Sequence, residues 1–242
     1  MGQPAPAAAK SSGLSILWDV VVAPKAAFAA LREQPHWLTA FVVTAVLGAL
    51  GAALAIPANQ HMVISTLAQM AQTNPQIAQL TPDQRQNIVN MQVSIQHYLW
   101  LAYPIFLLIG TLVTAVIMLV FNAISQGDGN FKRFFALAVN VALIYWGIAY
   151  FLVGLISYLR GPDAFNSARD MYNILPSLSW FVPGAPVKAT VLLAAVGPFS
   201  LWSLILIAFG MQETARIKPA AAWIGAIVIV FGGALIGAAF AQ

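Results

Sequence analysis

Five long apolar stretches alternate with shorter polar segments along the chain. They cover residues 38–57, 98–121, 134–159, 189–211 and 219–241, and none of them contains Asp, Glu, Lys, Arg or His. A helix of about 20 apolar residues is long enough to cross the ~30 Å hydrocarbon core of a bilayer. The pattern therefore predicts an all-α membrane protein whose domain, residues 38–242, has five transmembrane helices.

The chain before the first apolar stretch divides into two parts. Residues 1–13 are rich in Pro, Ala and Ser, which is typical of a flexible terminus. Residues 14–37 repeat apolar side chains at helical spacing, which predicts an interfacial amphipathic helix with a break at Pro24. The alternative is a helix packed on the protein's own spans, and the two placements are compatible. The candidate lipid-surface anchors here are two aromatic and two basic residues, namely Trp18, Lys25, Phe28 and Arg32.

A polar segment with few charges separates the first two spans. Residues 59–96 carry only Asp83 and Arg85 as charged residues, and their apolar positions predict two amphipathic helices. Asn74 and Pro75 mark the turn between them. The second helix has a start signal, with Thr81 as the N-cap, Pro82 at the first helical position and Gln84 completing a capping box. We expect a helical outer loop that lies as a cap against the membrane surface.

Composition agrees with the membrane assignment and excludes several kinds of chemistry. The chain is 60% hydrophobic and 7% charged, whereas soluble domains carry about 25% charged residues. It has no cysteine, which excludes disulfides and thiolate chemistry. The net charge of +4 does not indicate nucleic-acid binding, because the basic residues lie mostly beside the apolar stretches.

The distribution of basic residues predicts an orientation. With the N-terminus inside, seven of the eleven Lys and Arg residues fall on the inner side, including Lys132 and Arg133 in the turn between the second and third spans. Membrane proteins retain basic loops in the cytoplasm. We therefore expect a cytoplasmic N-terminus and a C-terminus outside, with Lys132 and Arg133 as further candidate lipid-surface anchors.

The spans offer few groups for chemistry. Ionisable side chains inside membranes usually mark proton relays and ion paths, and these spans have none, so no catalytic, cofactor or metal site is predicted. Asn140 is the most polar mid-span side chain, and it either hydrogen-bonds a neighbouring helix or contacts a substrate. Gly233 and Gly237 form a Gly-x-x-x-Gly pair, which suits close helix packing inside the fold or between copies.

Several short motifs, in order, resemble a known family. They are Trp18–Phe28 with Gln34–Trp37, Thr81–Arg85, the turn Gly127–Arg133, and Phe199–Trp202 followed by Gly210 and Arg216. Together they resemble the bacterial Yip-domain integral membrane proteins. The resemblance implies a five-span protein of the bacterial inner membrane with a cytoplasmic N-terminus. Eukaryotic relatives bind Rab-type GTPases, but their Asp-Leu-Tyr-Gly-Pro element is not found here, so that role does not transfer.

Two functions are compatible with this pattern. The first is a non-enzymatic membrane scaffold or adaptor, whose partners are membrane lipids and a membrane protein or a second copy of the chain. The second is a transporter, channel or lipid-handling protein for an uncharged or amphiphilic substrate, suggested by Asn140, by Pro198 in the fourth span and by the segment 59–96. A membrane enzyme has no candidate residues beyond scattered acids.

Overall fold

The computed structural model describes residues 12–240, and all the regular structure in that range is helical. Most of residues 1–13, the expected flexible terminus, lie outside the described residues. Ser12 caps the first helix, which starts at Gly13. The helices, in chain order, are α1 Gly13–Val22, α2 Pro24–Glu33, α3 Leu38–Leu54, α4 Ile56–Thr73, α5 Pro75–Ala78, α6 Pro82–Leu99, α7 Tyr103–Ser125, α8 Phe131–Ala142, the π-helical η1 Leu143–Ala149, α9 Tyr150–Arg160, the short 3₁₀ turn η2 Pro162–Ala164, α10 Ala168–Tyr172, the 3₁₀ turn η3 Leu178–Phe181, α11 Val187–Ala194, α12 Pro198–Ala215 and α13 Pro219–Phe240.

Three continuous helices are long and apolar enough to cross a membrane. They are α7, the combined α8–η1–α9 helix and α13. Two bent pairs, α3 with α4 (46°) and α11 with α12 (52°), each qualify as a span only when their helices are taken together. The structure thus supports three to five spans. The second span starts at Tyr103 rather than at residue 98, because α6 runs to Leu99 and a turn follows it.

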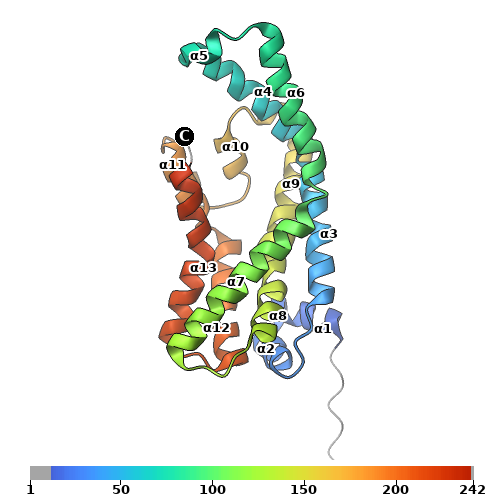
Figure 1. The fold of residues 1–242 in the computed structure, drawn as a ribbon, viewed down its shortest axis with the longest axis vertical. Helices are drawn as coiled ribbons and strands as arrows, with labels where there is room; N and C mark the ends of the chain where they lie inside the picture. The colour runs from blue at the N-terminus through green and yellow to red at the C-terminus, as the bar shows by residue number, and fades with distance from the viewer. Residues whose placement is uncertain (1–11, 241–242) are drawn as a thin grey trace, which may run out of the picture.

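The α8–η1–α9 helix is the central member of the bundle. Half of its most apolar stretch is buried, against 22% in α7 and 17% in α13. It lies against α3, α7 and α12, and α12 in turn packs on α2 and α13. The bundle is elongated, with α1, α2 and the turns α7–α8 and α12–α13 at one end, which we call the α1–α2 end (Figure 1).

Small residues decide how closely α3 and α9 approach. A Cβ atom added to Gly154 would lie 2.0 Å from the carbonyl oxygen of Gly51, so the two backbones are in direct contact. One turn earlier on α3, Gly48 leaves the space that the ring of Tyr103 fills. The small-residue spacing in the first span therefore serves packing inside the fold, in line with the sequence pattern.

The central helix contains a π-helical segment that the sequence did not predict. In η1 the wider turn leaves backbone carbonyls without their usual helical partners. The hydroxyl of Tyr103 donates to the carbonyl oxygen of Trp146 in that segment. A side chain from α7 thereby satisfies part of the irregular backbone, as is required of a segment that lies in hydrocarbon.

At the helix break before Pro198, a free backbone carbonyl also finds a hydrogen-bond partner within the protein. Pro198 occupies the first turn of α12, so the expected fourth span is divided into α11 and α12. The amide of Leu178 donates to the carbonyl oxygen of Val196 at 3.0 Å. Gly197 packs against the carbonyl of Pro176, 2.7 Å from where its Cβ would lie. The protein's own loop covers this break.

Helices α4, α5 and α6 form an arm at the opposite end of the bundle (Figure 1). Thr81 and Gln84 make the reciprocal capping box, with Pro82 in the first turn, as the sequence predicted. Asn74 caps the short α5 that separates the two long helices. The arm is held at its base by a small core of Ala58, Phe165 and Ile174.

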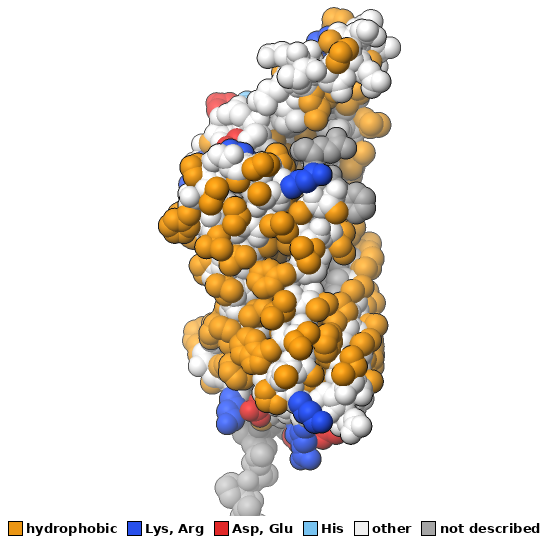
Figure 2. Space-filling model, turned by 90° about the vertical axis from the view of Figure 1, so that its left-hand side faces the viewer, with side chains coloured by type: hydrophobic (Ala, Val, Ile, Leu, Met, Phe, Trp, Pro, Cys, Tyr) orange, Lys and Arg blue, Asp and Glu red, His pale blue; other side chains and the backbone are white. Residues whose placement is uncertain are grey.

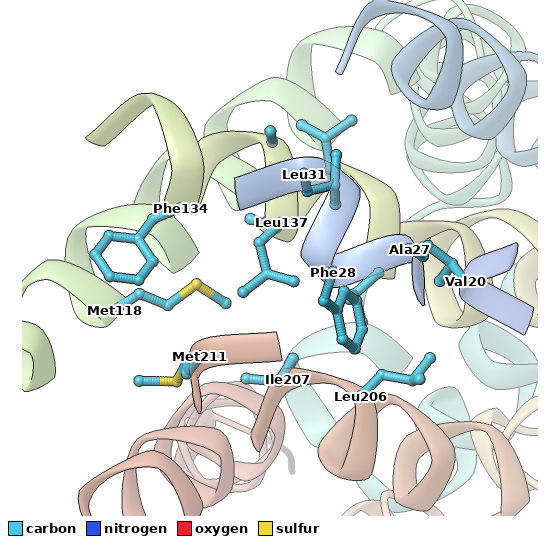
Figure 3. Packing of buried hydrophobic residues seen from close by; sticks show 14 of the residues in the cluster. Val20, Ala27, Phe28, Leu31, Met118, Phe134, Leu137, Leu206, Ile207 and Met211 are labelled. Carbon is cyan, nitrogen blue, oxygen red and sulfur yellow. The ribbon is translucent and has the colours of Figure 1, made fainter. Parts of the chain in front are cut away.

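The largest core lies near the α1–α2 end and includes Phe28 (Figure 3). Phe28 is 0% exposed and points from α2 toward Leu206 and Ile207 of α12. The prediction that Phe28 is a lipid-surface anchor is therefore wrong. The helical spacing identified Phe28 as part of an apolar face, but it is the protein, not the lipid, that covers this face.

Candidate functional site

The α1–α2 end carries most of the sequence-predicted anchors and is the candidate functional site. Helix α1 is apolar on two faces. One face, with Ile16, Leu17 and Val20, is buried in the core, while the other exposes Leu14, Trp18 and Val22 at four-residue spacing. Trp18 is 67% exposed. An exposed apolar stripe beside a packed one fits a helix that both packs on the bundle and faces lipid.

Basic and acidic side chains gather below the broad apolar band of the bundle (Figure 2). At this end Lys25 and Lys132 are exposed, whereas Arg133 is half-buried. Arg133 donates to the backbone carbonyl of Asp128 at 3.3 Å. Lys25 and Lys132 are therefore the anchors whose charges stay accessible, and their contact with lipid remains a prediction.

Arg32 is engaged inside the protein. Its guanidinium donates to the carboxylate of Asp128 at 2.6 Å, and the Nε of Arg216 lies 3.6 Å from the same oxygen. Asp128 thus joins α2 and the α12–α13 turn to the α7–α8 turn. Partly exposed pairs of this kind contribute little stability singly, under about 1 kcal/mol. Their effect is to fix the arrangement of three segments. The main role of Arg32 is therefore structural, and any contact with lipid is secondary.

The turn Gln126–Asn130 and the preceding Ser125 are held against the α12–α13 turn by hydrogen bonds. The amide of Asp128 donates to the carbonyl oxygen of Ala215 at 2.9 Å. Across the same junction, the amide of Lys218 donates to the hydroxyl of Ser125 at 2.7 Å. Gly129 is required by space, because an added Cβ would lie 2.6 Å from that of Ala215. The Gly-Asp-Gly-Asn sequence therefore makes a tight, buttressed turn.

Asn140 is buried in α8, 1% exposed. Its side-chain amide donates to the carbonyl oxygens of His36 and Ala136, each at 2.8 Å. The His36 carbonyl lies in the connection between α2 and α3, so Asn140 ties the central helix to that connection. Both amide hydrogens are used by backbone groups, which favours the structural interpretation over substrate contact.

Gly233 and Gly237 are exposed on α13 and do not form a close contact within the fold. In the described part of the chain, an added Cβ on Gly233 meets nothing within 4 Å, and one on Gly237 meets only Val191, at 3.8 Å. Gly225, about two turns earlier on α13, instead packs against Phe121 and Met211. The Gly-x-x-x-Gly pair therefore faces outward.

No site for a metal is found among residues 12–240, where no three His, Asp or Glu side chains come together. The three residues that sequence reasoning missed are Asp128 as the centre of the ion pairs, Arg216 as its second partner, and Tyr103 as the partner of η1. The sequence gives only a weak signal for these three roles, because each role depends on which distant segments meet in the folded protein.

The fold and the surface described above define a polytopic α-helical membrane protein. The Yip1 domain family profile matches residues 18–240, and the chain belongs to this family. It is similar to the membrane protein YknW of Bacillus subtilis (strain 168), with 27% identity over 106 residues. That alignment covers 44% of this chain and 42% of YknW, so the chain matches less than half the length of this relative. No solved structure matches the chain at a significant level.

Proposed function

We propose that the chain is a non-enzymatic scaffold of the bacterial inner membrane that acts by associating with other membrane proteins or with a second copy. Membership in the Yip1 domain family supports this, because the family is not a known enzyme family. The observation that carries the proposal is Asn140, the one strongly polar mid-span group identified from the sequence. Both of its amide hydrogens are donated to backbone carbonyl oxygens, and its side chain is buried.

The proposed topology has five spans, with a cytoplasmic N-terminus and the C-terminus outside. In this arrangement α3 with the first residues of α4 supplies the first span, and the bent pair α11–α12 supplies the fourth. The accessible Lys25 and Lys132 then lie at the cytoplasmic surface together with Trp18, which suits a polar–apolar boundary. The α1–α2 end is thus the lipid anchor of the scaffold.

The outward face of α13 is the proposed association surface. It combines the open Gly233 and Gly237 with the exposed Ile236, and glycine lets a second backbone approach closely. The alternative, a transporter or lipid-handling protein, has less support, because residues 176–178 cover the break at Pro198 and both amide hydrogens of Asn140 are bonded to backbone.

Gly233→Leu is expected to remove the partner without harming the fold. The new side chain would extend into open space, so the melting temperature should change by less than about 2 °C, while proteins that co-purify in mild detergent should be lost. Co-purification followed by quantitative mass spectrometry measures this. Val113→Leu, on the exposed face of α7, is the matched control and should retain the partners. A wild-type chain that purifies only as a solitary monomer contradicts the proposal.

A further inference from the structure

Two hollows at the α1–α2 end each contain one lysine and one glutamate. The first, about 290 Å³, lies between α2 and α12 and is lined by Pro24, Lys25, Phe209 and Glu213. The second, about 330 Å³, is more open and is lined by Glu33, Gln34, Pro35, His36 and Lys132. The first volume is at the lower end of the range for ligand sites.

The opposite charges that line the first hollow do not neutralise each other. In the described part of the chain, neither Lys25 nor Glu213 belongs to an ion pair, although both border the same space. An exposed Lys with a long flexible stem and a half-buried carboxylate thus remain available on either side of it. A ligand that carries one negative and one positive group would pair with both at once.

With the α1–α2 end at the bilayer surface, as proposed above, the hollow lies at the depth of lipid headgroups. Glu213 lies two residues before the end of α12, and Phe209 lies one helical turn deeper. Phe209 is partly exposed, and its ring packs edge-to-face on Trp223 of α13, with centroids 6.0 Å apart. The hollow therefore passes from charged groups to an exposed aromatic wall, in the order in which a phospholipid passes from headgroup to acyl chain.

We infer that the hollow between α2 and α12 binds a zwitterionic phospholipid of the ethanolamine type. The phosphate would pair with Lys25 and the ammonium with Glu213. The part of an acyl chain nearest the headgroup would lie on Phe209 and Trp223. A primary ammonium suits a carboxylate because it donates hydrogen bonds, which a choline group does not. An anionic headgroup would meet the carboxylate of Glu213 unfavourably. The inference rests on the proposed location of the α1–α2 end at the bilayer surface.

Native mass spectrometry of the full chain in detergent tests this, with equal amounts of phosphatidylethanolamine and phosphatidylglycerol of the same acyl chains. The wild type is expected to retain the ethanolamine lipid about three- to fivefold more than the glycerol lipid, as partly exposed charge pairs allow. Glu213→Gln should remove or reverse that preference, and Lys25→Gln should lower the retention of both lipids. Glycerophosphoethanolamine, which has the headgroup without the chains, should not bind measurably.

The matched controls remove one negative or one positive charge at the same end of the bundle, from residues that do not line the hollow. They are Asp19→Asn for the acid and Lys218→Gln for the base, and both should keep the wild-type preference. Glu213→Ala, a second variant at the site, should reproduce the result of Glu213→Gln, and unchanged melting temperatures establish that the variants are folded. A wild type that prefers phosphatidylglycerol, or a Glu213→Gln variant that behaves like Asp19→Asn, overturns the inference. Partner loss in the Gly233→Leu experiment is scored separately, so either idea can fail without the other.

Discussion

Gly154→Ala is expected to destabilise the protein more than any other single-methyl addition described here. The new Cβ would lie 2.0 Å from the carbonyl oxygen of Gly51 and 2.6 Å from its Cα. Carbon–oxygen contacts between helices settle near 3.3–3.6 Å, so α3 and α9 would have to separate by more than 1 Å along their whole contact. Overpacking usually costs about 1–3 kcal/mol and occasionally more. We expect a cost at the upper end of that range or beyond, because the Gly51 atoms that the new Cβ would meet belong to the backbone and cannot rotate away.

Thermal denaturation in detergent, followed by size-exclusion fluorescence, measures the effect. Gly233→Ala is the control, because it makes the same chemical change where nothing lies within 4 Å among the described residues. The control should melt with the wild type, whereas Gly154→Ala should melt at least about 5 °C lower or fail to accumulate. Equal melting of the two variants would show that α3 and α9 do not touch as described.

Phe28→Ala is expected to release α1 and α2 from the bundle. Phe28 is fully buried among Leu137, Leu206 and Ile207, and its ring joins α2 to α8 and α12 (Figure 3). Truncation of a fully buried Phe typically costs about 3–5 kcal/mol. The loss should be local first, because α1 and α2 are short helices at one end of the bundle.

Limited proteolysis of the connection at residues 34–37, together with the melting temperature, tests this expectation. The variant should be cleaved there at least about tenfold faster than the wild type. Phe181→Ala, at a position 82% exposed, removes the same ring from the surface and should leave both measurements unchanged. If Phe28→Ala resists cleavage as the wild type does, Phe28 is not the residue that holds the helix pair.

The sequence predicted those features of the fold that depend on neighbouring residues. The absence of strands among the described residues, the break at Pro24 and the capping box at Thr81 each follow from local chemistry and are confirmed. The small-residue face around Gly48 and Gly51 was also identified, although the sequence did not reveal that Gly154 is its partner.

The features that the sequence did not predict depend on which segments meet. Phe28 and Trp18 both lie on apolar helical faces, and only the packing of α2 on α12 distinguishes the buried residue from the exposed one. In the candidate site, the sequence did not predict how the basic residues pair. Arg32 and Arg133 are bound to the turn at Asp128, which leaves Lys25 and Lys132 accessible.

The central claim is that the chain acts through association at the outer face of α13. Photo-cross-linking in native membranes tests it most directly, with a photoreactive residue in place of Ile236, which is 64% exposed on α13. The matched probe replaces Ile105, which is 60% exposed on α7. The scaffold account predicts a discrete protein adduct from position 236, absent in the Gly233→Leu background, and only lipid adducts from position 105. Lipid adducts alone from both positions would contradict it.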